Sequence, residues 1–183
     1  ELWICTRNQV SHYNSDYSLK KRYGNLIPAV PNNGINSIYE DHFGNIWVCT
    51  WGGGLYKYLK NTDTFMSFPT LGVNNNPFKI FQDRDDQYWI LTWGDGIYRF
   101  HPDATEDKMY THQEIFNEKL HLPETAFFSV VQDDVYGYIW VFGYHELYAF
   151  KVVDGHLEKV DLSSYMFDYN KMFSQIIKDR EGN

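Results

Sequence analysis

Residues 38–58 read IYEDHFGNIWVCTWGGGLYKY. A short apolar strand runs into an acid and a Gly-containing turn, a second strand centred on Val48 follows, and a Gly-rich turn leads to a third strand rich in tyrosine. Aromatic and β-branched residues bounded by turn signals are typical of short β-strands. The stretch therefore predicts three consecutive strands joined by tight turns.

The same pattern recurs along the chain. Each second strand carries one tryptophan, and these anchor tryptophans are spaced by 44, 42 and 51 residues, at Trp3, Trp47, Trp89 and Trp140. A more polar fourth strand follows the third, for example at residues 64–68. Repeats of this length with four strands each are typical of β-propeller blades, which cover one another's apolar faces. We therefore expect an all-β propeller of four-stranded meander blades. The one candidate helix lies around residues 113–119, in the insertion that lengthens the third spacing.

The repeats divide the chain into a partial blade at residues 1–31, blades at 32–74, 75–124 and 125–170, and the first strand of a further blade at 171–183. Two arrangements remain open. The chain is a fragment of a larger ring of about seven blades, or its two ends share one blade and close a ring of four. We favour the fragment, because the chain begins and stops inside the pattern and would leave apolar strands unpaired.

The composition excludes several classes of function. The net charge is −8, the sequence pI is about 5.3, and the most basic run is Lys20-Lys21-Arg22. An acidic surface repels phosphate, so nucleic acid is a poor partner and a neutral or cationic ligand is easier to host. The histidines show no zinc-ligand spacing, and the turns lack the full calcium loop. No metal and no cofactor are expected.

The repeat resembles the two-component regulator propeller repeat. The features that carry the resemblance are an apolar strand followed by Glu-Asp, a Gly turn, Ile-Trp-Val-x-Thr and Gly-Gly-Leu-Tyr-x-Tyr. Residues 38–58 are its clearest copy and residues 80–100 a second, whereas residues 130–150 depart more, with Gly143-Tyr144-His145-Glu146 in place of Thr-x-Gly-Gly. The resemblance implies the periplasmic sensor region of an inner-membrane hybrid histidine kinase of Bacteroidetes type, with the kinase outside this chain. It also implies an oligosaccharide ligand, the remaining blades of the same propeller as partners, and a homodimer formed through the full-length sensor.

Two further tryptophans differ from the anchors. Trp51 and Trp93 each follow a threonine, Thr50 or Thr92, that ends the second strand, and so they stand at the turn between the second and third strands. We expect the connections between blades to lie on the same face as these turns. Aromatic rings beside amides and carboxylates suit a sugar, which offers flat apolar faces and hydroxyls. The alternative is that these rings cap the blade core and the asparagines are turn residues. The candidate ligand-binding residues are Trp51, Trp93, Tyr144, His145, Asp95, Asn33, Asn76 and Arg7.

The anchor tryptophans are expected to be structural and to pack between adjacent blades. The acids that open the turns before them, Asp41, Asp83 and Asp133 or Asp134, are expected on the opposite face from Trp51 and Trp93. Cys5 and Cys49 occupy equivalent positions in neighbouring repeats. Such positions lie too far apart for a disulfide, so both are expected as free, buried thiols.

No catalytic residue is assigned, because the sequence holds neither Gly-x-Ser-x-Gly nor His-Glu-x-x-His. The leading hypothesis is a non-enzymatic propeller segment that senses an oligosaccharide. A protein-interaction scaffold or dimerisation propeller is the alternative, followed by a polysaccharide-active propeller enzyme.

Overall fold

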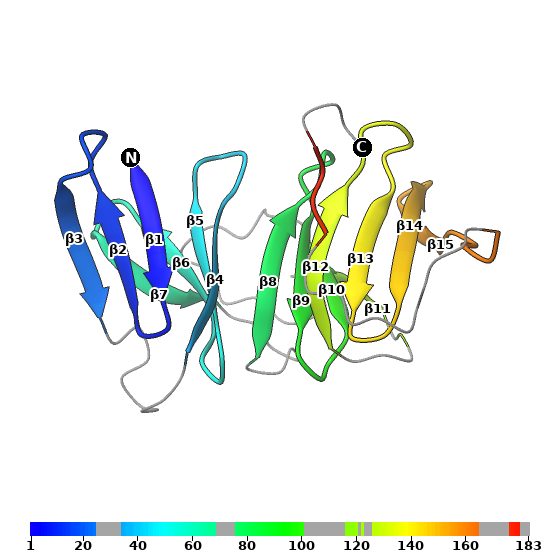
Figure 1. Ribbon diagram of the computed structural model, residues 1–183, viewed down its shortest axis with the longest axis horizontal. Helices are drawn as coiled ribbons and strands as arrows, with labels where there is room; N and C mark the ends of the chain where they lie inside the picture. The colour runs from blue at the N-terminus through cyan, green and yellow to red at the C-terminus, as the bar shows by residue number, and fades with distance from the viewer. Residues whose placement is uncertain are drawn as a thin grey trace.

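The computed structural model describes residues 1–24, 34–68, 76–100, 116–120, 122, 126–164 and 176–179. Within these ranges the chain forms strands and no helix (Figure 1). No helix in the described ranges is therefore long and apolar enough to cross a membrane.

The strands form four antiparallel sheets, which we call blades 1 to 4. Blade 1 holds β1 (Leu2–Thr6), β2 (Gln9–Tyr13) and β3 (Leu19–Gly24). Blade 2 holds β4 (Ile35–Glu40), β5 (Ile46–Thr50), β6 (Gly54–Leu59) and β7 (Thr64–Phe68). Blade 3 holds β8 (Pro77–Gln82), β9 (Tyr88–Thr92), β10 (Ile97–Phe100) and β11 (Phe116–Leu120). Blade 4 holds β12 (Phe127–Gln132), β13 (Ile139–Gly143), β14 (Leu147–Val153) and β15 (His156–Lys159).

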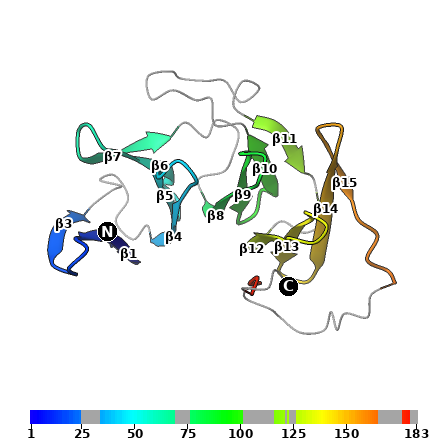
Figure 2. The same cartoon turned by 90° about the horizontal axis from the view of Figure 1, so that it is seen from above.

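Each blade is a meander, because every strand pairs with the next along the chain. Seen from above, the blades stand side by side in an arc, with the first strands β4, β8 and β12 toward one common side and the later strands fanning outward (Figure 2). Strand β8 contacts both β4 and β12. The prediction of an all-β propeller of four-stranded meander blades is confirmed.

The predicted helix around residues 113–119 is wrong where the structure describes it. Residues 116–120 form strand β11, which pairs antiparallel with β10 as the outer strand of blade 3. Without β11, the outward N–H and C=O groups of β10 would have no ladder partner, and pairing outweighs a weak local preference for helix.

The predicted boundaries between blades, after residues 31, 74, 124 and 170, all lie outside the described residues. The described part of the last segment, residues 176–179, forms no strand. It lies against β12, where Ser129 Oγ accepts a 3.1 Å hydrogen bond from the Ile176 N–H and lies 3.3 Å from the Ile176 carbonyl oxygen.

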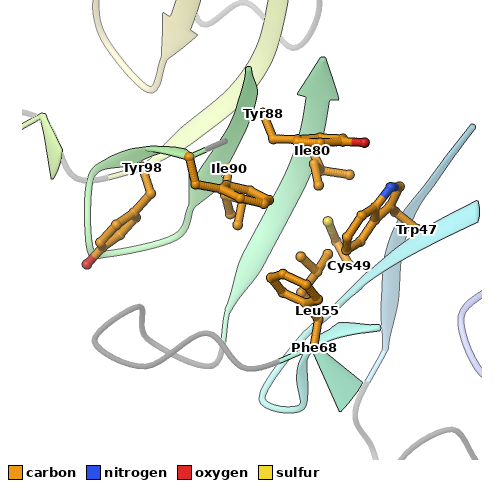
Figure 3. Close-up of a cluster of buried hydrophobic side chains, with 9 residues drawn as sticks. Trp47, Cys49, Leu55, Phe68, Ile80, Tyr88, Ile90 and Tyr98 are labelled. Atoms are coloured by element: carbon orange, nitrogen blue, oxygen red, sulfur yellow. The ribbon is translucent and has the colours of Figure 1, made fainter. Parts of the chain in front are cut away.

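The core lies between blades. Between blades 2 and 3, one apolar cluster combines side chains of both sheets, and Figure 3 shows those of blade 2 facing those of blade 3. Its fully enclosed members include Cys49, Leu55, Ile80, Ile90 and Tyr98, each 0% exposed. A second cluster joins blades 3 and 4 around Trp89 and Phe150. Burial of both sheet faces explains why the strands are apolar on both sides rather than alternating.

The anchor tryptophans are tied to the turn acids. The indole Nε1 of Trp47, Trp89 and Trp140 donates to a carboxylate oxygen of Asp41, Asp83 and Asp133 at 2.8, 2.7 and 2.8 Å. Each carboxylate also accepts backbone N–H groups of its own turn. The acid of the fourth repeat is therefore Asp133, whereas Asp134 forms ion pairs with Arg84 and Lys178.

Both cysteines are free thiols, with Cys49 buried and Cys5 half-buried. Burial raises the pKa of the Cys49 thiol to about 12, so it is protonated at neutral pH and unreactive. The expectation of free thiols is confirmed for both, but the expectation of burial is right for Cys49 and wrong for Cys5, which is half-buried.

Candidate functional site

The propeller segment has two faces, set by its turns. The Asp face carries the turns between first and second strands, opened by Asp41, Asp83 and Asp133, at the top of Figure 1. The Trp face, at the bottom of Figure 1, carries the turns between second and third strands, which hold Trp51 and Trp93.

Trp51 and Trp93 occupy equivalent positions in two turns that are closed by the same hydrogen bond. The anchor Thr side chains donate across the turn, Thr50 Oγ1 to the Gly54 carbonyl at 2.6 Å and Thr92 Oγ1 to the Gly96 carbonyl at 2.7 Å. Gly96 has a φ of +78°, and a Cβ there would lie 2.8 Å from the Leu120 carbonyl oxygen, so only glycine fits. The tight turn leaves the preceding tryptophan projecting from the blade.

Hydrogen bonds on the Trp face join neighbouring blades. The Ile35 N–H donates to the Arg7 carbonyl at 2.7 Å, the Gly52 N–H donates to Asn76 Oδ1 at 2.8 Å, and Trp93 forms an antiparallel bridge with Ala126. Each contact links a second-to-third-strand turn to the start of the next blade. The described residues that begin blades 2, 3 and 4, Ile35, Asn76 and Ala126, therefore lie at this face, as the sequence predicts for the connections that lead into them.

Four aromatic side chains form a continuous row across blades 2, 3 and 4, which we call the aromatic row: Trp51, Trp93, Phe128 and Tyr144. Their ring centroids are 5.7, 5.4 and 6.1 Å apart in that order. The rings are tilted or edge-to-face, with interplanar angles of 63°, 65° and 50°. Trp51 and Trp93 remain 40% and 38% exposed.

The row extends at two points. Phe78 packs edge-to-face on Phe128, with centroids 5.3 Å apart, and His145 packs on Tyr144 at 4.5 Å. His145 and Glu146 are exposed and border a depression of about 650 Å³, whose other wall is formed by Lys159 and residues 160–163. The Trp face therefore offers apolar ring surface that ends beside charged and polar groups.

The remaining predicted site residues differ in what they do. Asp95 is half-buried and accepts a 2.5 Å hydrogen bond from the Tyr98 hydroxyl, so one carboxylate oxygen is already engaged. Asn76 uses its side-chain oxygen to hold the Gly52 N–H. Arg7 is exposed, and its side chain lies along Gly34. Asn33 lies outside the described residues.

Sequence reasoning missed Phe78 and Phe128. Both stand where the first strand bulges against the second, since the pairing register shifts between Pro77 and Lys79 and between Phe127 and Ser129. Asn36 holds the same position in blade 2. The sequence offered one signal for them, an aromatic residue two positions before the apolar pair of the first strand. The pattern of a strand does not reveal a bulge, however, so it does not show where these two rings lie.

No group of three or more His, Cys, Asp or Glu side chains that could hold a metal ion occurs in the part of the chain that the structure describes. The carboxylates of the Asp face are held by indole and backbone donors.

Comparison with known proteins bears on the repeat and on the fold. The family model described as two component regulator propeller matches residues 29–52. No curated protein sequence is significantly similar to this chain.

Several solved structures share the fold. The extracellular domain of the hybrid two component system BT4673 from B. thetaiotaomicron superposes with a TM-score of 0.75 at 18% identity, over 98% of this chain and 26% of that chain. The corresponding domain of BT3049 from B. thetaiotaomicron gives a TM-score of 0.63 at 19% identity, over 87% of this chain and 21% of that one. Virginiamycin B lyase from Staphylococcus aureus gives 0.60 at 14% identity, over 89% of this chain and 52% of the lyase.

This chain thus spans about a quarter of the length of the first of these domains. Identities this low establish the fold and leave function to the site. The chain has the β-propeller fold, and its residues 29–52 match the two component regulator propeller repeat.

Proposed function

We propose that this chain is part of the extracellular ligand-sensing propeller of a two-component sensor, and that it binds an oligosaccharide on the aromatic row. The observation that carries the proposal is the row itself. Two tryptophans at equivalent turns of neighbouring blades are more than one-third exposed, they contact each other, and Trp93 also contacts Phe128.

Sugars suit this surface for a physical reason. A pyranose ring presents a patch of C–H groups that packs on an aromatic face, while its hydroxyls require donors and acceptors around the edge. The two partly exposed tryptophans offer apolar ring surface for such contacts, and His145 and Glu146 supply polar groups at one end of the row. Exposed apolar side chains that gather in one place on a soluble protein mark binding sites.

The proposal also includes the setting of the site. The structural likeness to extracellular domains of B. thetaiotaomicron sensors supports a location outside the cytoplasm, in a protein anchored in the inner membrane. The partners are then the other blades of the same propeller and a second copy of the full-length sensor. Signalling would pass to a kinase that lies outside this chain.

Binding without catalysis is the second part of the proposal. The likeness to virginiamycin B lyase supports no enzymatic role by itself, because blades of this kind serve unrelated functions. A bound oligosaccharide recovered unchanged after prolonged incubation supports a sensor. Time-dependent cleavage that is lost on substitution of a single carboxylate would instead make the chain an enzyme.

The experiment that tests binding uses an array of neutral, uronate-containing and sulfated oligosaccharides, followed by calorimetric titration of those retained. The double variant Trp51→Ala/Trp93→Ala should lose binding while its thermal unfolding stays close to wild type. Phe43→Ala is the matched control, since Phe43 is 58% exposed and lies on the Asp face. A dimer that forms without sugar, together with no retained oligosaccharide, would favour the interaction scaffold.

A further inference from the structure

Lys79 places a charge where the first strands of blades 2 and 4 carry serine. It follows the bulged residue Phe78 on β8, and its ammonium points across to β12, where Nζ lies 3.5 Å from Ser129 Oγ. The ring of Phe78 crosses the same gap to Phe128. The residues that these two side chains meet, Phe128 and Ser129, are also consecutive, so the ammonium and the ring cross between the same two strands at adjacent positions.

The equivalent positions in the other blades show that the fold does not require a lysine there. Ser37 in blade 2 and Ser129 in blade 4 occupy this place. Ser37 Oγ donates to the Phe78 carbonyl on the next first strand at 2.9 Å, and Ser129 Oγ contacts Ile176. Both serines therefore bond to the neighbouring segment, and Lys79 does the same through its long contact to Ser129, but only Lys79 brings a charge to this position.

No carboxylate in the part of the chain that the structure describes balances the charge of Lys79. Four other lysines of the described residues form ion pairs with carboxylates, namely Lys20 with Glu1, Lys21 with Asp63, Lys151 with Glu158 and Lys178 with Asp134. Lys57 and Lys159 lie over the rings of Trp47 and Tyr148, and Lys60 is exposed. Lys79 forms no ion pair with a carboxylate of the described residues, and its one hydrogen bond is the long contact to Ser129. Burial lowers the pKa of its ammonium. A half-buried cation without a counter-ion is unfavourable unless an anion is supplied.

We infer that Lys79 is an anion-binding residue at the edge of the aromatic row, and that the oligosaccharide bound there carries a carboxylate or sulfate group. The inference rests on the proposed function. The net charge of −8 disfavours anions at long range, but screening limits that repulsion, whereas a desolvated ammonium gives a strong local bond to an oxyanion.

The test compares Lys79→Ser, which installs the residue of blades 2 and 4, with Lys79→Arg, which keeps the charge. Calorimetric titration is made with the acidic oligosaccharides retained on the array and with neutral oligosaccharides of the same length. Lys79→Ser should weaken binding of the acidic ligands at least about tenfold and leave neutral ones unchanged, and Lys79→Arg should retain most of the affinity. Uronate and sulfate ligands in separate titrations tell the two anions apart.

A second measurement needs no sugar. Sodium sulfate replaces sodium chloride stepwise at constant ionic strength while the ¹³Cε signal of Lys79 is followed by NMR. In the wild type this signal should shift with sulfate concentration and reach saturation. If the wild type retains only neutral oligosaccharides and Trp51→Ala/Trp93→Ala does not bind them, the anion site is overturned and the proposed function stands. Sulfate binding at Lys79 with no oligosaccharide retained would instead overturn the proposed function. Acidic ligands bound equally by wild type and Lys79→Ser would also contradict the inference.

Discussion

The indole Nε1 of Trp47 donates a 2.8 Å hydrogen bond to Oδ2 of Asp41, and both side chains are buried. The same oxygen accepts a 2.5 Å hydrogen bond from the hydroxyl of Tyr88, which comes from the next blade. Oδ1 accepts the backbone N–H groups of Phe43 and Asn45. One carboxylate therefore joins a turn, an anchor tryptophan and the neighbouring blade.

Asp41→Asn should destabilise the protein by about 2–3 kcal/mol, because an amide nitrogen would face donors that now bond to a charged oxygen. Urea unfolding of the purified chain measures the change. Asp85→Asn is the control, since Asp85 is exposed in the matching turn of blade 3, and it should stay within about 0.5 kcal/mol of wild type. Equal stability of the two variants would show that the Asp41 contacts are not stabilising.

Tyr88→Phe should raise the pKa of Asp41. Burial opposes ionisation of Asp41, but hydrogen bonds from Tyr88, Trp47 and Asn45 more than offset it and hold its pKa below the ordinary value. Asp83 has the same turn and indole bonds, and there burial wins and raises the pKa. Carboxyl ¹³C titration by NMR should show the pKa of Asp41 moving toward that of Asp83, and no movement would refute the role assigned to the hydroxyl.

Asp63 should make the stability depend on pH at the outer rim, between blades 1 and 2. Its carboxylate accepts hydrogen bonds from Lys21 at 2.6 Å, Tyr23 at 2.6 Å and Tyr58 at 2.7 Å. The Lys21 ammonium, followed by the two hydroxyls, holds the pKa of Asp63 well below its ordinary 3.8. A lowered carboxyl pKa contributes stability above the unfolded pKa, and this is lost as the pH falls through the folded pKa.

Asp63→Asn should therefore lower the urea midpoint at pH 7, and the difference from wild type should shrink as the pH falls below about 3. Asparagine tolerates the left-handed backbone of this position, where φ is 54°, so backbone strain does not enter the comparison. A difference that stays constant with pH would argue against the ionised carboxylate as its source.

Gly96→Ala and Gly155→Ala separate backbone strain from steric overlap. Both glycines have positive φ, +78° and +80°, but a Cβ at Gly96 would meet the Leu120 carbonyl oxygen at 2.8 Å, whereas one at Gly155 meets nothing within 4 Å. Gly155→Ala should cost about 1–2 kcal/mol from the backbone alone, and Gly96→Ala clearly more. Similar unfolding free energies for the two variants would mean that strand β11 can move aside.

The repeat, the all-β class and the exposed turn tryptophans are readable from the sequence because each repeat places one Trp and one Gly-rich turn at fixed offsets. The bulge is not readable, since it depends on how two strands pair, and so Phe78 and Phe128 were absent from the predicted site. Asp133 and Asp134 are adjacent acids, and only the geometry shows which one meets the indole of Trp140. The role of Asn76 in holding the turn at Gly52 likewise depends on a contact between segments distant in sequence. The bond from Tyr98 to Asp95 is local, but the sequence pattern does not show which way these two side chains point.

The proposed binding surface is tested most directly by the indole N–H signals of the six tryptophans in an NMR titration with the oligosaccharide that binds most tightly. The account predicts saturable shifts for Trp51 and Trp93, while the signals of the four anchors Trp3, Trp47, Trp89 and Trp140 stay in place. Shifts confined to the anchors, or binding that moves neither Trp51 nor Trp93, would contradict it.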